Sequence, residues 1–214
     1  TVHGWKGGIV TNPNCSTVFL AMVLAALRMF EPRAVVVSTL QAVSGAGYPG
    51  LSSMDIVGNV LPHIGGEEEK METETQKILG RVSDKGVESY PVDISAHCNR
   101  VSVVNGHTET MSISFGAQPS LEEVRAALEG FSSVPQERDL PSAPKHPIKY
   151  FDDPNRPQPR LDVDCGAGMT MTIGRLRPCT VLDYRLVALG HNTVRGAAGA
   201  AVLNAELMQA EGYL

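Results

Sequence analysis

Two spacings of apolar residues recur along this chain, and each predicts one kind of element. Apolar residues three and four positions apart, followed in several places by Gly or Pro, predict helices at 16–30, 52–59, 67–79, 121–130 and 194–209. Runs that are rich in β-branched residues or that alternate in polarity predict strands at 6–11, 33–39, 91–96, 99–104, 109–115, 169–177 and 181–189. Because helices and strands do not alternate regularly, the sequence predicts an α+β fold with a mixed, largely antiparallel sheet and flanking helices.

Turn signals connect some of these elements. Asn105 and Gly106 predict a tight turn that pairs the strands on either side of it as an antiparallel hairpin. The last two predicted strands form a second hairpin. The stretch 134–159 holds seven prolines, which exclude a helix or a central strand, so we predict an ordered surface loop or a mobile connection there.

Composition narrows the class of protein. The 214 residues, with 43% hydrophobic residues and a net charge of -5, suffice for a single domain over 1–214 with an aliphatic core. The chain has no basic stripe, and its longest apolar stretch is about ten residues where roughly 20 span a bilayer, so we expect neither nucleic acid nor a membrane as a partner. Four cysteines without a CxxC pair indicate a reducing compartment, and we expect a cytoplasmic protein with free thiols.

Cys15 is the first candidate for chemistry. It stands in the run NPNCST at 12–17, where Pro13 and two asparagines predict a turn just before a helix. A thiol at a helix start has its thiolate stabilised by the helix dipole and by free backbone N–H groups, so we predict a lowered thiol pKa and a nucleophilic role. The alternative is a small buried core cysteine.

A cysteine nucleophile needs a proton acceptor, and six histidines are available. His107 is favoured because it follows Gly106 at the predicted turn, where rigid strands can hold its ring toward a cleft. Arg100 stands on the strand that enters the same turn and offers a forked donor suited to a carboxylate. The alternatives are a structural or surface histidine and an edge-strand charge.

Glu67 and Lys70 are three residues apart in the predicted helix 67–79 and therefore lie on one face of it. A solvated salt bridge is the default interpretation. The alternative is a helix face that lines the cleft, where Glu67 holds an ammonium group and Lys70 holds an anion.

Two further patterns are rejected. GAGYPG at 45–50 matches the dinucleotide fingerprint GxGxxG, but Pro49 and the short polar continuation do not open the long helix that a pyrophosphate needs. We expect close backbone packing near the thiol in this loop instead. A zinc site is not expected, because structural zinc uses close ligand pairs and the candidate ligands are scattered. These candidates are His97, Cys98, Cys165 and Cys179.

Ordered motifs run through nearly the whole chain. They are NPNCST at 12–17, TLQAVSGAG at 39–47, PHIGGEEEKMETETQKIL at 62–79, AHCNRV at 96–101, GHTE at 106–109, RPQPRLD at 156–162, GRLRPC at 174–179 and GHNTVRGAAGAAVLNAEL at 190–207. Together they resemble the aspartate-semialdehyde dehydrogenase family, in particular its fungal and archaeal branch. The resemblance implies the C-terminal catalytic domain of the glyceraldehyde-3-phosphate dehydrogenase-like fold.

That resemblance implies roles for the candidates above. Cys15 corresponds to the nucleophile, His107 to the general acid/base and Gln41 to the residue that orients the thiohemiacetal. Arg100 corresponds to the ligand of the substrate carboxylate, and Glu67 to the ligand of the substrate ammonium group. In the implied reaction the thiolate adds to aspartate semialdehyde, hydride passes to NADP, and phosphate releases aspartyl phosphate. The reverse direction is biosynthetic and leads to lysine, threonine and methionine.

The resemblance also implies contacts for phosphate and cofactor. Asn14 and Lys70 correspond to contacts with inorganic phosphate. Asn192 corresponds to a residue near the nicotinamide amide, and Ser44 and Gly45 correspond to cofactor-binding positions. No metal ion is implied.

Members of that family carry an NADP-binding domain ahead of this segment, and the fourteen residues before Cys15 cannot form one. We therefore expect a truncated catalytic and dimerisation domain that forms a homodimer or tetramer through its sheet and has negligible dehydrogenase activity alone. The terminal helix 194–209, which packs on the missing domain in the family, would lose a partner for its apolar face at Val202 and Leu203.

Three alternatives stay open. They are an inert dimerisation module, an acyl-CoA reductase of the malonyl type, and N-acetyl-glutamyl-phosphate reductase, which differs around its cysteine. Glu67 separates the enzymes, because only a substrate with a free ammonium group needs that carboxylate. A cysteine hydrolase is disfavoured, since no third group that would orient His107 stands out.

Overall fold

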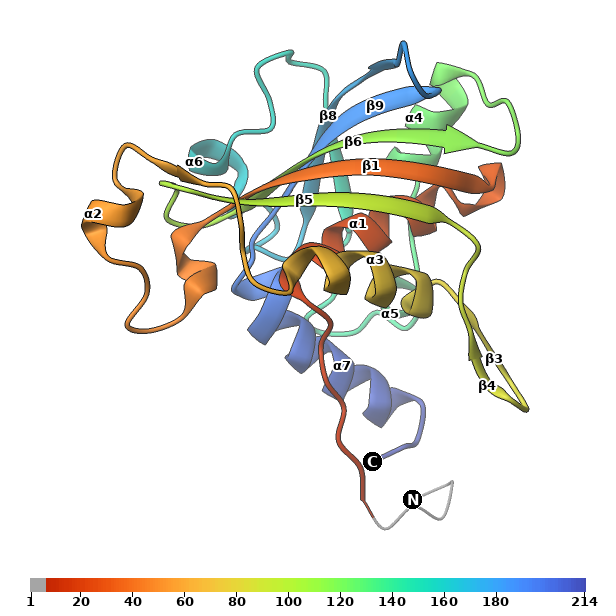
Figure 1. The fold of residues 1–214 in the computed structure, drawn as a ribbon. Helices are drawn as coiled ribbons and strands as arrows, with labels where there is room; N and C mark the ends of the chain where they lie inside the picture. Colours follow the sequence, from red (N-terminus) through yellow and green to blue (C-terminus); the bar gives the residue numbers. More distant parts are fainter. Residues whose placement is uncertain (1–6) are drawn as a thin grey trace.

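The computed structural model describes residues 7–214 and contains a seven-stranded sheet with helices packed against it (Figure 1). The strands are β1 (Pro32–Gln41), β2 (Val60–Leu61), β5 (Asp93–Val101), β6 (His107–Phe115), β7 (Ile148–Phe151), β8 (Met171–Pro178) and β9 (Tyr184–Gly190). A separate ribbon is formed by β3 (Arg81–Ser83) and β4 (Gly86–Glu88). The helices are α1 (Cys15–Ala26), α2 (Ser53–Ile56), α3 (Glu67–Ile78), α4 (Leu121–Glu129), α5 (Val134–Glu137), α6 (Pro159–Asp162) and α7 (Gly199–Ala210).

The large sheet has the strand order β2-β5-β1-β6-β9-β8-β7. Two of its neighbouring pairs, β1 with β5 and β7 with β8, are parallel, and the other four pairs are antiparallel. The hairpin predicted near the end of the chain is present as β8 and β9. The predicted fold class, a mixed and largely antiparallel sheet with flanking helices, is confirmed.

The hairpin predicted around Asn105 and Gly106 is wrong. The two strand segments predicted at 91–96 and 99–104 are one strand, β5, and β5 does not pair with β6. Strand β1 lies between them, parallel to β5 and antiparallel to β6. A turn signal indicates where the chain reverses, but it does not reveal that an earlier strand with buried residues on one face, such as Val35, fills the gap.

Helix α1 is the centre of the core. Ten of its twelve residues are buried, as expected for a helix that is apolar on all sides. It ends at Ala26, earlier than the predicted 16–30, because a short 3-10 turn at Arg28–Phe30 and the left-handed backbone of Glu31 (φ 56°) redirect the chain into β1. Helices α3 and α4 contribute to the same core.

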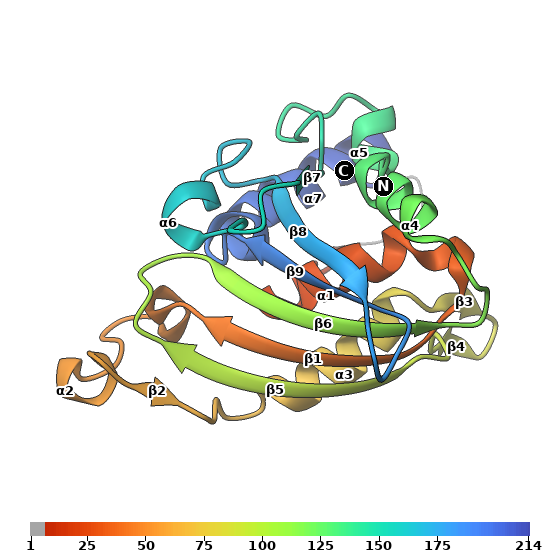
Figure 2. The same cartoon turned by 90° about the horizontal axis from the view of Figure 1, so that it is seen from above.

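The two faces of the sheet differ in what covers them. Figure 2 shows β1, β5 and β6 toward the viewer, with α1 and α3 behind them. On the uncovered face of β1, the side chains of Val36 and Leu40 remain 47% and 40% exposed. In β1, therefore, the apolar side chains of one face belong to the core and those of the other face meet solvent.

Three other segments correct the sequence-based expectations. The proline-rich stretch 134–159 is not a plain loop, because it contains α5 and the sheet strand β7. Leu203 of α7 does not lack a partner, since it is buried in a small cluster with Leu140 and Met169, although Val202 stays exposed. Residues 7–11 of the predicted strand 6–11 form no strand, and Lys6 lies outside the described residues.

Candidate functional site

Cys15 and His107 lie side by side, although 92 residues separate them in the sequence. Cys15 begins α1, and His107 is the first residue of β6. The Cys15 Sγ is 3.2 Å from the His107 Nε2, which is hydrogen-bonding distance for a sulfur and a ring nitrogen. The structure therefore brings the two predicted reactive groups together.

The start of α1 is fixed by Asn14. Its side-chain Oδ1 accepts hydrogen bonds from the backbone N–H groups of Ser16 (3.0 Å) and Thr17 (3.2 Å), as an N-cap residue does. Its own backbone N–H donates to the Glu74 Oε2 over 2.8 Å. The cap holds the thiol at a defined place at the end of the helix.

The predicted lowering of the Cys15 pKa is wrong for the chain as it stands. Burial, followed by the negative charge of Glu67, raises the pKa of the thiol to about 11, although the backbone N–H of Ser16 acts in the opposite direction. The helix start does favour the thiolate, but removal of the thiol from water outweighs it. Cys15 is therefore a neutral thiol until another positive charge approaches.

His107 is fully buried, and its ring has two neighbours. The Nδ1 accepts a hydrogen bond from the backbone N–H of Ala42 over 3.0 Å, and the Nε2 faces Cys15. Burial, followed by the charges of Arg100 and His191, lowers the pKa of His107 to about 3. The imidazole is neutral throughout the physiological pH range.

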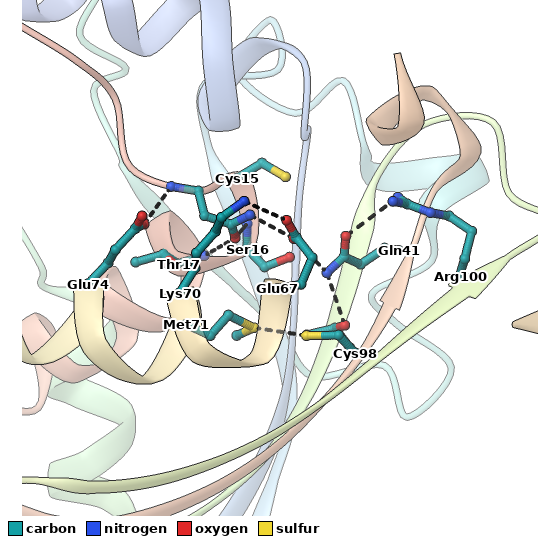
Figure 3. Close-up of polar contacts among 12 residues, drawn as sticks. Cys15, Ser16, Thr17, Gln41, Glu67, Lys70, Met71, Glu74, Cys98 and Arg100 are labelled. Carbon is teal, nitrogen blue, oxygen red and sulfur yellow. Dashed lines mark hydrogen bonds and ion pairs between the residues drawn. The ribbon is translucent and has the colours of Figure 1, made fainter. Parts of the chain in front are cut away.

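Glu67 is the hub of a polar network between α1 and the sheet (Figure 3). Its Oε2 accepts hydrogen bonds from the Asn14 Nδ2 at 2.6 Å and from the Gln41 Nε2 at 3.3 Å. The Lys70 Nζ lies 3.6 Å from the Glu67 Oε1, and the Lys70 side chain is about half exposed. The predicted salt bridge is present and it borders the thiol site, whereas the binding of an ammonium group by Glu67 and of an anion by Lys70 stays a prediction.

Arg100 lies on β5 directly across from Gln41 in the parallel register of β1. Its Nη1 donates to the Ala42 carbonyl over 2.8 Å and to the Gln41 Oε1 over 3.4 Å. Arg100 is buried, and among residues 7–214 it forms no salt bridge with a carboxylate. A buried guanidinium without a counterion is suited to receive an anionic group.

Asn192, Ser44 and Gly45 form a second edge of the site. The Asn192 Oδ1 accepts the backbone N–H of Gly106, and its Nδ2 donates to the Ser44 Oγ, both over 2.8 Å. A Cβ on Gly45 would lie 2.8 Å from the Arg100 Nη1 and 3.2 Å from a His107 ring nitrogen. The loop thus packs closely on the reactive groups, and only glycine leaves that space open.

All ten predicted site residues therefore lie in one connected region. They are Asn14, Cys15, Gln41, Ser44, Gly45, Glu67, Lys70, Arg100, His107 and Asn192. The hydrogen-bonding groups of the Asn14 side chain are already used by the helix cap and by Glu67.

Sequence analysis missed several neighbours of these residues. Glu109 is fully buried, neither of its carboxylate oxygens has a hydrogen-bond partner within the described chain, and burial raises its pKa well above the ordinary value. Its position, two residues after His107 on the same face of β6, was the available signal. The backbone N–H of Ala42 carries no such signal in the sequence.

The beginning of α1 also touches the C-terminal part of the chain. A Cβ on Gly196, in the π-helical segment Val194–Ala198, would lie only 2.9 Å from the Cys15 Cβ. The Asn12 Nδ2 donates to the Ala197 carbonyl over 2.7 Å. Asn12 and Cys15 are thus contacted by a segment about 180 residues away in the sequence.

Residues 7–214 contain no group of three or more His, Cys, Asp or Glu side chains placed to hold a metal ion. In the same described region, no helix combines the length and the apolar character that a membrane crossing requires.

The sequence profile of a family described as "Semialdehyde dehydrogenase, dimerisation domain" matches residues 24–195. The chain belongs to this family. An aspartate-semialdehyde dehydrogenase from Archaeoglobus fulgidus is 48% identical over 206 residues, which are 96% of this chain and 59% of that protein. The chain thus spans about 60% of the length of the curated relatives that it matches.

Solved structures in the semialdehyde dehydrogenase family have the same fold. A Candida albicans aspartate semialdehyde dehydrogenase with NADP superposes with a TM-score of 0.86 at 42% identity, over 94% of this chain and 57% of that one. The Vibrio cholerae enzyme II complexed with ASA gives a TM-score of 0.75 at 26% identity, over 94% of this chain and 62% of that one. These similarities confirm the predicted likeness to the C-terminal catalytic domain of the glyceraldehyde-3-phosphate dehydrogenase-like fold.

Proposed function

We propose that this chain is the thiol-bearing catalytic part of an NADP-dependent aspartate-semialdehyde dehydrogenase, which reduces aspartyl phosphate to aspartate semialdehyde. The observation that carries the proposal is the contact of 3.2 Å between Cys15 and His107, close to a buried Arg100 that forms no salt bridge within residues 7–214. The names of the relatives and of the structural neighbours support it.

The Cys15 sulfur performs the group transfer. As a thiolate it attacks the acyl carbon of aspartyl phosphate, the bond from that carbon to the phosphate oxygen breaks, and a thioester forms. The phosphate leaves with the electron pair of that bond and takes a proton from water. When NADPH is bound, it supplies the hydride that reduces the acyl carbon. The C–S bond then breaks and releases the aldehyde, because a thiolate is a good leaving group.

Arg100 and Glu67 select the substrate. Arg100 pairs with the carboxylate of the aspartyl group through the N–H donors that its contacts with the chain leave free. Glu67 pairs with the ammonium group, which competes with the Lys70 ammonium for the Glu67 carboxylate. A malonyl-CoA or an N-acetylated substrate has no ammonium group, so the partly buried Glu67 carboxylate favours the free amino acid over both alternatives.

Lys70 and Asn14 are the proposed contacts of inorganic phosphate. Lys70 is about half exposed and can turn from Glu67 to an anion at the mouth of the site. Asn14 contributes through its place at the helix start, where anions are favoured by the backbone N–H groups. Of these two contacts, Lys70 supplies the charge.

The cofactor contacts belong to the Ser44, Gly45 and Asn192 edge. Gly45 lies against His107 and Arg100 where a Cβ would not fit, so this edge of the site reaches the reactive groups through its backbone. A pyrophosphate needs a long helix after its glycine loop, but here the loop is followed by the four-residue α2. We therefore expect the polypeptide of residues 1–214 alone to have negligible NADP-dependent activity.

Assembly is proposed to occur through the uncovered face of the sheet, between two copies of this chain in a cytoplasmic enzyme. Support comes from the dimerisation-domain family and from the exposed apolar side chains of β1. An inert dimerisation module remains the alternative function, because it predicts the same dimer without a reactive thiol.

Thiol labelling of the 1–214 chain separates the enzyme domain from the inert module. Peptide mass spectrometry reads how fast an electrophile modifies each of the four cysteines, and among these thiols His107 contacts only Cys15. His107→Ala should slow the modification of Cys15, whereas the exposed His63→Ala should not. Equal labelling of all four thiols, unaffected by His107→Ala, would favour the inert module.

A further inference from the structure

Helix α3 lies along the edge of β5 that faces away from β1 (Figure 1). Strand β5 pairs with β1 over its whole length, but on its other edge it pairs with β2 only at Arg100 and Val101. An edge without a neighbouring strand leaves backbone N–H and C=O groups without partners. Side chains of α3 supply partners for this part of β5.

Two carboxylates of α3 accept hydrogen bonds from the β5 backbone. The Cys98 N–H donates to the Glu68 Oε1 over 3.0 Å, and the Ala96 N–H donates to the Glu72 Oε1 over 3.1 Å. Both strand residues are buried, whereas the two glutamates are partly buried. Hydrogen bonds to a charged acceptor are stronger than those between neutral groups, so these contacts hold the helix to the strand.

Gln76 extends this row of contacts to the residue before β5. Its Nε2 donates to the Val92 carbonyl over 2.8 Å. Glu68, Glu72 and Gln76 are four residues apart, so they lie on one side of the helix. The carboxylates meet N–H donors and the amide meets a carbonyl, whereas a carboxylate opposite that carbonyl would place two acceptors together. The three contacts therefore favour one position of α3 along the strand.

The same helix carries Glu67, the hub of the polar network at the thiol (Figure 3). Glu67 precedes Glu68 in the sequence and binds Gln41 on β1. Arg100 follows Cys98 by two residues, so the two side chains lie on the same face of β5. The contact between Glu68 and Cys98 thus directly joins the helix that holds Glu67 to the strand that holds Arg100.

We propose that Glu68 and Glu72 are positioning residues, which hold α3 at one place along β5 and thereby fix the separation between Glu67 and Arg100. Under the proposed function these two groups bind the ammonium and the carboxylate of one substrate, and an α-amino acid carries both groups on the same carbon. If α3 moved along β5, one of the two substrate groups would lose its partner. This role rests on the proposed function, whereas the contacts between α3 and β5 do not.

Amide hydrogen exchange of the 1–214 chain tests the contacts without substrate, with the N–H groups of β8 at the far side of the sheet as a reference for general stability. Glu68→Met keeps the length of the side chain but has no oxygen, so we expect the Cys98 N–H to exchange about tenfold faster. Glu68→Gln keeps an oxygen acceptor and should stay within about threefold of the parent. The exposed Glu69→Met is the control and should leave the exchange unchanged.

Glu68→Asp keeps the charge but is one carbon shorter, so it should raise the exchange of Cys98 as Glu68→Met does. This variant tests the contact even if the methionine variant does not fold. An exchange rate of Cys98 that is equal to that of the parent in either variant would overturn the proposal.

Steady-state kinetics test the positioning role in a protein that contains this chain and the remaining part of the enzyme. We expect Glu68→Met to raise KM for aspartate semialdehyde roughly tenfold and to keep kcat within about threefold, because binding is weakened and the chemical step is not. Glu68→Gln should restore the parent KM. Glu72→Met loses the same kind of contact one turn farther from Glu67, so we expect its KM to rise by about threefold or less. Equal KM values in Glu68→Met and Glu72→Met would show that the row only covers the strand edge.

A double variant shows whether Glu68 acts through Glu67. Because Glu67→Gln already lacks the charge for the substrate ammonium, the addition of Glu68→Met should change KM by less than about twofold. Two residues that act independently would instead give the product of the two single effects, and that result would contradict the proposal. An unchanged KM in Glu67→Gln alone would contradict the proposed function, whereas the exchange of the Cys98 N–H would still decide the contacts.

Discussion

The side chains on the two faces of β1 have different surroundings. Thr39 and Gln41 point to the covered face, where they join the network around Glu67, and Val35 packs in the core there. Val36 and Leu40 point to the uncovered face and meet solvent. A residue's place in the alternation thus decides whether its side chain faces the thiol site and the core or the solvent.

The covered face shifts the pKa values of the titratable groups that are buried there. Cys15 and Glu109 have raised pKa values and His107 has a lowered one, each with burial as the largest cause. All three groups are therefore kept neutral. This comparison predicts that a substitution on one face leaves the property of the other face unchanged.

The largest expected effect is that of Cys15→Ser on the covered face. In a protein that contains this chain and the remaining part of the enzyme, we expect a loss of at least about 10³-fold in the rate of aldehyde formation, because the hydroxyl is a poorer nucleophile and leaving group. Cys179→Ser, at the end of β8, is the control and should keep the parent rate. The dimer, measured by analytical ultracentrifugation, should be unchanged in both variants. Substantial activity of Cys15→Ser would refute the thioester mechanism.

On the uncovered face, Val36→Glu is expected to disrupt the dimer. Two copies of the carboxylate would be buried without partners, so we expect the dissociation constant to rise by more than about 100-fold. Thiol labelling of Cys15 should be unaffected. Val82→Glu, on the separate β3 and β4 ribbon, is the matched control. An intact dimer in Val36→Glu would place the interface elsewhere.

Glu67→Gln tests substrate selection on the covered face. The variant keeps a hydrogen-bond acceptor for Asn14 but loses the charge for the substrate ammonium, so we expect KM for aspartate semialdehyde to rise roughly 30-fold. Glu69→Gln, which is exposed on the same helix, should leave KM unchanged. If KM does not change in Glu67→Gln, a substrate without an ammonium group becomes the better hypothesis.

The smallest expected effect is on stability. Burial raises the pKa of Glu109 in the folded chain, whereas the unfolded chain loses that proton near its ordinary value of 4.5. Above pH 4.5 the folded state therefore binds more protons than the unfolded state, and stability falls as pH rises. Glu109→Gln removes this loss, so its free energy of unfolding should match the parent at pH 4.5 and exceed it by about 1–3 kcal/mol at pH 8. Urea titrations at both values, with the exposed Glu122→Gln as control, check the prediction, and a gap independent of pH would contradict it.

The sequence predicted the helices and strands better than it predicted which strands pair with one another. Helix α3 was predicted at 67–79 and ends at Ile78, because charge periodicity and Gly80 are local signals. The position of β1 between β5 and β6 was missed, since pairing between distant segments leaves no local trace. His107 was therefore chosen through a hairpin that does not exist, yet it lies beside Cys15, because the chain returns to the same end of the sheet.

The sequence also named the ten site residues but not their protonation. A helix start is visible in the run NPNCST, whereas the burial that raises the Cys15 pKa depends on segments far away in the chain. The Ala42 N–H that orients His107 belongs to the backbone, which every residue except proline shares. Such contacts depend on the fold, so side-chain patterns do not reveal them.

The close approach of Gly196 to Cys15 joins the two ends of the described chain at the thiol. Asn12 strengthens this connection through Ala197 and through Asn204, whose Nδ2 donates to the Asn12 Oδ1 over 2.9 Å. The segment Val194–Ala198 and helix α7 therefore lie directly beside the start of α1 and its thiol. Deleting the residues after 193 would remove these contacts and would therefore affect the thiol as a substitution in the active site does. The residues of the NPNCST run themselves would be unchanged.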